Sequence, residues 1–600
     1  MKLRLADFVA DFLVSHGICD CFTVTGGGAM HLNDALGHKK GIRCLYNHHE
    51  QACAIAAEAY ARVNNRIAAV CVTTGPGGTN AITGVMGGWL DSIPMLIISG
   101  QVRYDTSRRG MGVEVRAGGD QEFDITRAIA CMTKYSEMIE DPRRIKYALE
   151  RAVYLATHGR PGPCWIDIPV DIQGAVIDTE ELIAYDSAED SGDGAPKVDP
   201  AVVDRVIERL RGARRPVFYG GNGIRLSGGY RLFREVAERL NIPVVTGWDS
   251  IDLIPDTHPL YVGRGGMMGD RAGNFAVQKA DLVLAVGNRL SIRQVGYNYK
   301  AWAKNAFVIM VDVDEAELKK PTLHVEEPIH ADAREFLSHL LDRLPRGRLF
   351  ENDGWLEECR GWRERYPVVL ERHKRARGLT NPYAFMKALS ARLPEGYITV
   401  VSNGSACVVG SQAYEIKEDQ RFIINSGAAS MGYGLPAAIG VCRATSDREL
   451  VCVTGDGSIQ MNLQELQTIL TNELPIKIFV INNGGYHSIR QTQKNLFGAH
   501  SRVGVGPESH DLSFPELERL AWAYGYPYFS CRKNSEIEDS LDQVFMTEGA
   551  VLAEVFVDTD QIFEPKAATK RLSDGSFVSP PLEDLAPFLD RAELEDIMRQ

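Results

Sequence analysis

The chain of 600 residues has no long run of Lys or Arg, and its net charge of −13 is spread along its length. This argues against a nucleic acid or a membrane surface as partner. The N-terminal stretch MKLRLADFVADFLVSHG is interrupted by Asp7 and Asp11, which is typical of neither a secretory signal nor a membrane span. The 12 cysteines lie scattered in apolar runs, and Cys19-x-Cys21 has the wrong spacing for a zinc site. We therefore expect a cytoplasmic protein that acts on small molecules.

Strand-like apolar runs alternate with helical patterns over three long segments of the chain. Such alternation indicates βαβ units, so the predicted fold class is α/β with three parallel-sheet domains. The stretch SAEDSGDGAPKV has no periodic apolar positions and is typical of an exposed linker. The expected boundaries are domains at 1–186, 198–350 and 378–560, a linker at 187–197, a charged linker at 351–377 and a tail at 561–600. The first and third segments could share one architecture.

The most informative motif is Gly455-Asp456-Gly457, which 24 residues separate from Asn482-Asn483. Each end follows a strand-like run and the segment between them is helical, so both motifs should emerge at the carboxyl ends of parallel strands, where open α/β sheets bind ligands. Asp456 and Asn483 would face one another there. With a backbone carbonyl they supply the oxygen ligands that Mg²⁺ prefers.

The glycines at 455 and 457 allow the backbone to approach phosphate groups, and Ser458 is expected to open a helix whose N-terminus favours anions. A GDG triplet alone is an ordinary turn. Joined to two asparagines at this spacing and in this strand context, it resembles a binding motif for thiamine diphosphate.

Two further segments carry candidate residues. Glu50 stands at a strand-to-helix junction ahead of a glycine-rich loop, Gly75–Asn80, although a glutamate in a first helical turn can simply complement the helix dipole. Its neighbours His48 and His49 suggest a metal site, but adjacent residues rarely converge on one ion. Met431 lies in a glycine-rich turn, where the alternative is an ordinary core methionine.

These segments are similar to the acetolactate-synthase branch of the thiamine-diphosphate-dependent enzymes. The resemblance extends over nearly the whole chain, through phrases such as Thr73-Thr-Gly-Pro-Gly-Gly-Thr-Asn, Asp91-Ser-Ile-Pro, Arg160-Pro-Gly-Pro and Met431-Gly-Tyr-Gly-Leu-Pro. It implies a pyrimidine-binding, a central and a diphosphate-binding domain. It also implies a homodimer or homotetramer with active sites between subunits.

The resemblance assigns roles to named residues. Glu50 would hydrogen-bond the aminopyrimidine ring so that its amino nitrogen removes the thiazolium C2 proton, and Met431 would wedge between the two cofactor rings. Gly28 and Gln121 would orient the acceptor. The metal ligands would be Asp456, Asn483 and the backbone oxygen of Gly485. The remaining residues expected around thiamine diphosphate are Gly27, Gly404, Ser405, Gly455, Gly457, Ser458, Tyr486 and His487.

FAD is a further expected cofactor, because many acetolactate-synthase relatives bind it in the central domain. Arg289 and Arg293 match two arginines of the family's flavin motif, and Asp312 and Asp332 lie where the family contacts flavin. The acidic residues of that motif are missing here. An empty site and a site that binds ADP are therefore the alternatives to FAD.

Departures from the family concern the substrate. Thr492 replaces a tryptophan that favours 2-oxobutyrate as acceptor, and Ala406 replaces a frequent histidine. The loop Arg103–Gly119 carries four arginines that could bind acidic groups of a larger acceptor, or could simply be solvated. The region Asn483–Phe497 and the tail look similar to synthase-like enzymes of bacterial surface-polysaccharide clusters.

We therefore expect a carboligase that decarboxylates pyruvate or a similar short 2-oxo acid and transfers the acyl carbanion to an aldehyde or ketone, such as a nucleotide-linked ketosugar. The alternatives are a biosynthetic acetolactate synthase large subunit and a non-oxidative 2-oxo acid decarboxylase.

Overall fold

The computed structural model describes residues 1–192, 194, 196–351, 354–498, 502–571, 574 and 576–599. Residues 193 and 195 of the expected linker, 352 and 353 of the charged linker, and 572, 573, 575 and 600 of the tail lie outside the described residues. None of the helices in the described part of the chain combines the length and apolarity needed to cross a membrane.

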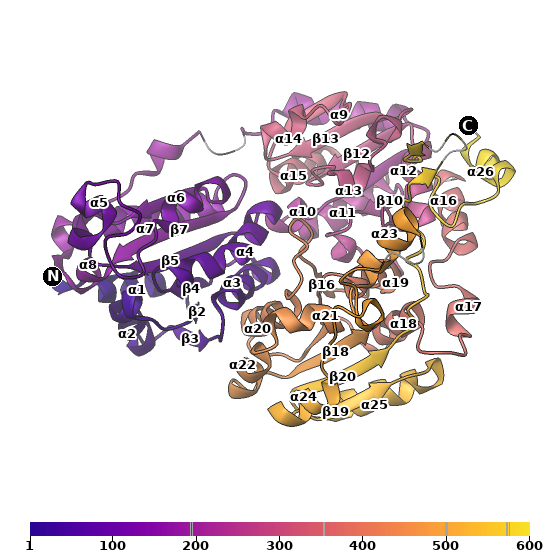
Figure 1. Cartoon of the computed structure of the whole chain (residues 1–600). Coiled ribbons are helices and arrows are strands. Elements are labelled where there is room, and N and C mark those ends of the chain that lie inside the picture. The colour runs from indigo at the N-terminus through magenta and orange to yellow at the C-terminus, as the bar shows by residue number, and fades with distance from the viewer. Residues whose placement is uncertain are drawn as a thin grey trace.

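Three parallel sheets of six strands each form the body of the molecule (Figure 1), which confirms the predicted fold class. The first sheet consists of β2 (Asp20–Thr23), β3 (Arg43–Tyr46), β4 (Ala69–Val72), β5 (Met95–Gln101), β6 (Tyr135–Met138) and β7 (Pro163–Pro169). The second consists of β9 (Pro216–Gly220), β10 (Val244–Thr246), β11 (Tyr261–Arg264), β12 (Leu282–Val286), β13 (Phe307–Asp312) and β14 (Glu327–His330). The third consists of β15 (Ile398–Val401), β16 (Arg421–Ile423), β17 (Leu450–Gly455), β18 (Ile476–Asn482), β19 (Tyr528–Cys531) and β20 (Val551–Phe556).

The first and third sheets have the same topology. Their strand orders are β3-β2-β4-β5-β7-β6 and β16-β15-β17-β18-β20-β19, so in each sheet the first strand lies between the second and the third. In a doubly wound sheet the loops diverge at this switch point and leave a crevice at the carboxyl ends of the strands. The switch points therefore lie between β2 and β4 and between β15 and β17.

The central sheet has a different order, β11-β10-β9-β12-β13-β14. Numbered within the sheet this is 3-2-1-4-5-6, the order of sheets that bind dinucleotides across their switch point. That point lies between β9 and β12, which pair in register from Leu282 with Pro216 to Val286 with Gly220.

Helices cover the faces of the three sheets. Those around the first sheet include α1 (Leu5–Ser15), α2 (Met30–His38), α3 (Glu50–Asn64), α4 (Pro76–Asp91) and α7 (Ile145–Thr157). Those around the second include α9 (Pro200–Gly212), α11 (Tyr230–Leu240), α12 (Arg271–Lys279) and α15 (Ala333–Arg343). Those around the third include α18 (Pro382–Arg392), α19 (Ser405–Ala413), α20 (Gly434–Ala444), α22 (Glu465–Thr471), α23 (His487–Phe497), α24 (Leu517–Tyr524) and α25 (Ile537–Met546).

Helices α3 and α20 join the first and third blocks, and Figure 1 shows them side by side. A Cβ atom at Gly440 would lie 1.9 Å from the carbonyl oxygen of Ala56, so only glycine permits this approach. The buried Glu58 of α3 accepts a hydrogen bond from the Tyr433 hydroxyl (2.9 Å) and pairs with Arg62. One hydrophobic core cluster extends across both helices, so the two blocks are packed as one unit.

The segments expected to be linkers and tail carry structure of their own. A 3₁₀ helix at Ser187–Asp190 is tied to α7, where Arg151 pairs with Asp190 at 2.8 Å. Helix α16 (Gly354–Arg365) places Trp355 and Trp362 in the core of the central block. Helix α26 (Arg591–Met598) of the tail buries Leu594 and Ile597 in the same core. Although the segment is rich in charge, helix α16 has an apolar stripe at helical spacing.

Candidate functional site

The candidate residues of the third block meet at the switch point of the third sheet. The Ser402 hydroxyl after β15 and the Ser458 hydroxyl after β17 lie 2.6 Å apart. The amide of Gly432, next to Met431, donates to the Ser458 hydroxyl (2.9 Å), which fixes the Met431 turn to the other two loops. Helix α21 (Asp456–Ile459) begins two residues before Ser458, where we expected its start, and the Asp456 carboxylate accepts from the Gly457 amide at 3.0 Å.

Asp456 follows β17, and Asn483 follows the neighbouring strand β18 and opens the loop that contains Gly485. The Asp456 carboxylate accepts from the amide of Gly485 (2.8 Å), the third candidate ligand. The Asn483 side-chain amide donates to the Ser405 hydroxyl (2.8 Å), next to Gly404. Burial raises the pKa of Asp456 to about 7, because the carboxylate is largely removed from water.

The oxygen atoms at this point fit a divalent cation. The Asn483 Oδ1 atom is buried and has no hydrogen-bond partner among the described residues, which is costly for an amide oxygen unless a ligand satisfies it. In the described part of the chain no group of three or more His, Cys, Asp or Glu residues is placed to hold a metal ion. A cation bound here would therefore rest on one carboxylate, one amide oxygen, a backbone carbonyl and ligand oxygens, a set that suits Mg²⁺.

Gly485 and Gly457 allow close packing around this loop. Gly485 has φ = +117°, and a Cβ atom there would lie 2.1 Å from the carbonyl oxygen of Val505. A Cβ atom at Gly457 would lie 2.4 Å from the ring of Tyr486. Gly455 precedes Asp456 at the end of β17, where a Cβ atom would meet nothing closer than 3.9 Å. The ring of Tyr486 therefore covers the Gly457 turn.

Sequence reasoning missed Arg490, which holds the same loop. Its guanidinium donates to the carbonyl oxygens of Asn483 (3.0 Å) and Gly484 (2.9 Å) and pairs with Glu508. The candidate residue His487 lies one turn earlier on α23, and its Nε2 lies 2.8 Å from the carbonyl oxygen of Gln561. Burial lowers the pKa of His487, with Arg490 and Lys566 adding to the effect, so the imidazole is neutral at neutral pH. The only sequence signal for Arg490 was its place in the first turns of α23.

The candidate residues of the first block lie at the corresponding switch point of the first sheet. The amide of Gly28, next to the exposed Gly27, donates to the Thr73 hydroxyl (3.1 Å) and thereby joins the loops after β2 and β4. Glu50, at the start of α3, accepts from the Asn80 side chain at 3.0 Å. A Cβ atom at Gly75 would lie 2.4 Å from the Gln121 carbonyl oxygen, so Gln121 packs against the glycine-rich loop.

Segments that flank the two half-sites are joined within one chain. Asn47 donates to Glu465 (2.8 Å), and Asn462 donates both to Gln51 (2.9 Å), the neighbour of Glu50, and to the carbonyl oxygen of Gly432 (2.9 Å). Among the described residues, no hydrogen bond connects Glu50 with Asp456 or Asn483.

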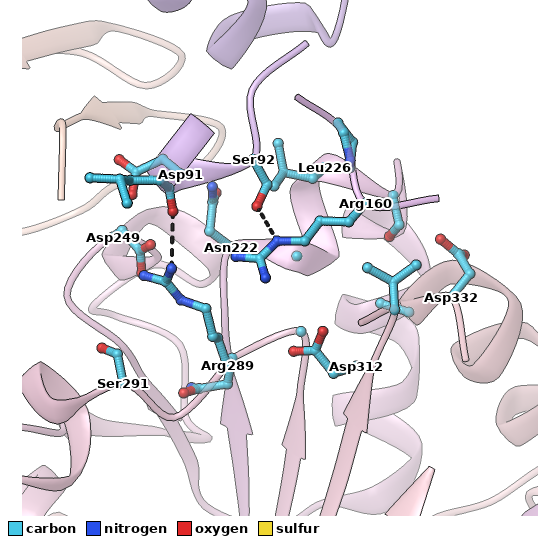
Figure 2. Close-up of a pocket in the computed structure, with 18 of the residues that line it drawn as sticks. Asp91, Ser92, Arg160, Asn222, Leu226, Asp249, Arg289, Ser291, Asp312 and Asp332 are labelled. Atoms are coloured by element: carbon cyan, nitrogen blue, oxygen red, sulfur yellow. Dashed lines mark hydrogen bonds between the residues drawn. The ribbon is translucent and has the colours of Figure 1, made fainter. Parts of the chain in front are cut away.

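A cavity of about 330 Å³ lies at the switch point of the central sheet (Figure 2), and Arg289, Arg293, Asp312 and Asp332 all line it. Burial raises the pKa of Asp312 to about 6. The loops after β9 and β12 approach closely, because a Cβ atom at Gly221 would lie 2.2 Å from the Cα of Asn288. The cavity therefore has the position in the sheet and the closely packed glycine loops that are typical of a nucleotide site.

The opposite wall of this cavity comes from the first block, a contribution that sequence reasoning missed. Arg289 donates to the carbonyl oxygen of Leu90 (3.0 Å), and Arg160 donates to the Ser92 hydroxyl at 2.8 Å (Figure 2). Asp91 also lines the cavity. Three of these residues stand in the phrases that carried the family resemblance, but nothing in the sequence placed them opposite Arg289.

The arginine-rich loop has partners of its own. Arg103 pairs with Asp105 at 2.8 Å, Arg109 pairs with Asp124 at 3.1 Å, and Arg108 pairs with Glu114. Most of the positive charge is thus neutralised within the first block, which favours the solvated loop over an anion site.

The fold and the sites together define a three-domain α/β enzyme that binds a cofactor at half-sites of matched topology. Comparison with known proteins agrees with this class. Residues 3–127 match "Thiamine pyrophosphate enzyme, N-terminal TPP binding domain", residues 203–340 match the central domain and residues 402–555 match the C-terminal TPP binding domain of the same enzymes.

Among its relatives, the chain is 33% identical to acetolactate synthase isozyme 3 large subunit of Escherichia coli, over 90% of this chain and 91% of that protein. It is 32% identical to the acetolactate synthase large subunit of Cyanidium caldarium, over 93% and 94%. It is 30% identical to that of Haemophilus influenzae, over 97% and 99%. The chain therefore belongs to the thiamine pyrophosphate enzyme family, and within it to the enzymes that resemble acetolactate synthase.

Proposed function

We propose that this enzyme is a carboligase dependent on thiamine diphosphate and Mg²⁺. It decarboxylates pyruvate or a similar short 2-oxo acid and transfers the acyl unit to an aldehyde or ketone. The observation that carries the proposal is the buried side-chain oxygen of Asn483, which has no partner among the described residues. It belongs to the loop that the Asp456 carboxylate binds, at the carboxyl ends of β17 and β18. A bound cation would satisfy this oxygen. A cation at the carboxyl end of β17 would in turn bind the oxygens of a diphosphate.

The third block would hold the charged end of the cofactor. Asp456, the Asn483 Oδ1 atom and the Gly485 carbonyl would hold Mg²⁺, and their loop is anchored by Arg490. The residues around the diphosphate and thiazolium would be Gly404, Ser405, Gly455, Gly457, Ser458, Tyr486 and His487. When bound, thiamine diphosphate supplies a carbon nucleophile that attacks the 2-oxo group and stabilises the electrons released as CO₂ leaves.

The first block would act on the other end of the cofactor. Glu50, oriented by Asn80, would hold a proton at the aminopyrimidine nitrogen, a role that requires a carboxylate within hydrogen-bond reach. Met431 would fill the space between the two rings, which suits an unbranched side chain. Gly28 and Gln121 would orient the acceptor, with Gly27 at the cofactor.

We propose a homodimer or homotetramer in which each active site combines half-sites of two subunits, as the similarity to this family of oligomeric enzymes supports. The loops at 26–28 and 75–80 of one copy would then face the 455–458 loop of the other.

We propose an acceptor other than 2-oxobutyrate, because Thr492 lies exposed on α23 and replaces the bulk of a tryptophan. A nucleotide-linked ketosugar fits the additional space. The second candidate is acetolactate formation, which the similarity to acetolactate synthase large subunits favours. Simple release of an aldehyde is the third.

We also propose that the central cavity holds FAD, with ADP or no ligand as alternatives. The supporting observations are the 3-2-1-4-5-6 strand order and the convergence of Arg289, Arg293, Asp312 and Asp332 on one cavity. Denaturing the purified protein and identifying the released nucleotide by mass spectrometry distinguishes FAD from ADP.

The test of the main proposal is CO₂ release from pyruvate and longer 2-oxo acids, with thiamine diphosphate and with or without Mg²⁺. We expect release that EDTA abolishes, and product analysis with ketone and nucleotide-ketosugar acceptors identifies the acceptor. Asp456→Ala should lose Mg²⁺-dependent binding of thiamine diphosphate, measured by calorimetry. No CO₂ from any short 2-oxo acid would refute the enzyme activity proposed, and normal affinity of Asp456→Ala would refute the metal site.

A further inference from the structure

Lys566, in the tail, is a partly buried lysine with an unusual environment. Its Nζ donates to the Oε1 atom of Gln491 (3.2 Å), and no carboxylate among the described residues pairs with it. Burial lowers the pKa of Lys566. A cation that is partly removed from water and has no counterion destabilises the fold unless a ligand supplies the opposite charge.

Two other lysines of low exposure have carboxylate partners. Lys279 pairs with Glu358 at 2.9 Å, and Lys320 pairs with Glu317 at 2.9 Å. The carboxylate nearest to Lys566 in sequence, Glu564, is already bound by His373 (2.8 Å) and Arg372 (2.6 Å). Glu564 therefore does not serve as the partner of Lys566.

The main chain keeps Lys566 in place. Its amide donates to the carbonyl oxygen of Ala586 (2.9 Å), and the amide of Ala586 donates back to the Lys566 carbonyl at 2.8 Å. The next amide, of Ala567, donates to the carbonyl oxygen of Met267 (2.7 Å), and the amide of Met267 donates to the carbonyl oxygen of Arg293 (2.7 Å). Lys566 is thus connected to a residue that lines the central cavity.

On its other side Lys566 reaches the cofactor half-site of the third block. Gln491 and His487 lie one turn apart on α23, and their Nε2 atoms both approach the carbonyl oxygen of Gln561, at 3.2 and 2.8 Å. Arg490, between them, binds the carbonyl of Asn483. The tail, yellow in Figure 1, thereby passes along α23 on its way to the central block. The ammonium therefore contacts the helix that also carries His487 and Arg490.

We propose that Lys566 and Gln491 form a subsite for an anionic oxygen group, a carboxylate or a phosphate, on the carbonyl acceptor. This inference rests on the proposed carboligase function. The ammonium would form the charge-assisted hydrogen bond to the acceptor, and the Gln491 amide would position it. Lys566 is a specificity residue in this scheme and takes no part in decarboxylation.

The test compares Lys566→Met and Lys566→Arg with the control Lys570→Met, which removes a more exposed lysine four residues further on, 4.0 Å from Asp584. Pyruvate is the donor, and the acceptors form two matched pairs: 2-oxobutanoate with butanone, and dihydroxyacetone phosphate with dihydroxyacetone. In Lys566→Met we expect kcat/KM for a charged acceptor to fall about 10- to 100-fold relative to its neutral partner. Lys566→Arg should recover most of this ratio, and Lys570→Met should not change it. If the ratio falls for 2-oxobutanoate, the group bound is a carboxylate. If it falls for dihydroxyacetone phosphate, the group bound is a phosphate.

A second measurement does not depend on turnover. The cofactor-loaded wild-type protein is acetylated with acetic anhydride, and modification of Lys566 is followed by mass spectrometry. We expect 2-oxobutanoate or dihydroxyacetone phosphate to slow this modification several-fold while butanone and dihydroxyacetone do not. Equal modification with all four probes would overturn the assignment.

The proposed function and this inference fail in different ways. Absence of CO₂ release from any short 2-oxo acid refutes the function itself. If CO₂ release is normal and the charged-to-neutral ratio is the same in wild type and Lys566→Met, the function stands and the subsite is refuted. If Lys566→Met slows CO₂ release from pyruvate as much as it slows carboligation, Lys566 acts on the donor or the cofactor, and the assignment to the acceptor is wrong.

Discussion

At the scale of the residue, the proposed chemistry depends on a few polar groups whose protein partners are incomplete. The Asn483 Oδ1 atom has no partner among the described residues, and Asp456 is held by two backbone amides while burial raises its pKa. Glu50 has one fixed partner, Asn80, and remains partly accessible. These groups differ from the buried Glu58 of α3, which Arg62 and Tyr433 satisfy fully. A polar group with incomplete hydrogen bonding indicates a ligand site, whereas a fully hydrogen-bonded buried group indicates a structural role.

Glu50→Gln tests the proton-holding role at this scale. The variant should bind thiamine diphosphate with unchanged affinity, because Asp456 and Asn483 are intact. Exchange of the cofactor C2 proton with solvent, measured by NMR, should fall on the order of 10²- to 10⁴-fold, since a glutamine cannot transfer the proton. Glu180→Gln, which changes an exposed glutamate of the same block, is the matched control. Unchanged exchange in Glu50→Gln would remove Glu50 from its role.

At the scale of the element, loops at strand ends and a docked tail place the site. Two sheets of one topology each present their switch-point loops, after β2 and β4 and after β15 and β17. The tail then crosses from the third block to the central one. Glu564 secures the tail through His373, Arg372 and Gln561, at 2.8, 2.6 and 3.0 Å. Docking of this segment fixes Lys566 against α23.

The tail should loosen in acid. Burial acts to raise the pKa of Glu564, but the hydrogen bonds from His373 and Arg372 outweigh it and lower the pKa from its usual 4.5 to about 2. A depressed pKa stabilises the folded state above pH 4.5, and this contribution is lost as the pH falls from 4.5 towards 2. Glu564→Gln should thus cost about 2 kcal/mol at pH 7, with the difference from wild type shrinking towards pH 3. Proteolysis of the tail and denaturant unfolding measure it, with the exposed Glu595→Gln as control. A difference that does not change with pH would contradict the assignment.

At the scale of the whole molecule, the first and third blocks are packed through α3 and α20. The central block adds a cavity whose far wall belongs to the first block. In the proposed oligomer, a second copy of the chain would complete each active site.

Mixing two inactive variants tests the shared site. Glu50→Gln and Asp456→Ala should each abolish activity, one through the first block and one through the third. If subunits share sites, co-expression produces mixed dimers in which one site carries both changes and the other carries neither. About a quarter of wild-type activity should then return, since half of the dimers are mixed and half of their sites are intact. Activity that stays at the level of the single variants would place both half-sites in one chain.

Local pattern was sufficient for much of the fold and part of the site. Strand-like runs and helical spacing predicted three parallel α/β blocks, and the structure has three such sheets. The sequence predicts a linker at 351–377 because its charges are frequent. In the structure, helix α16 of this segment buries Trp355 and Trp362 in the core of the central block. Charge count does not reveal which face of a helix is apolar. Helix α21 also begins at Asp456, before the expected start at Ser458, because its N-cap is Gly455, which has no side chain to mark the helix start.

The sequence by itself determined the cofactor motif, because Gly455–Gly457 and Asn482–Asn483 belong to one βαβ unit, whose loops meet whatever the rest of the chain does. Only the tertiary structure decided which distant groups face that unit. It placed Arg490 on the loop carbonyls, Lys566 against Gln491, and Arg160 across the central cavity from Asp312. These contacts join residues of different helices, loops and blocks, and they depend on how whole layers pack. The cofactor motif is thus encoded locally, while the contacts that surround it arise from packing.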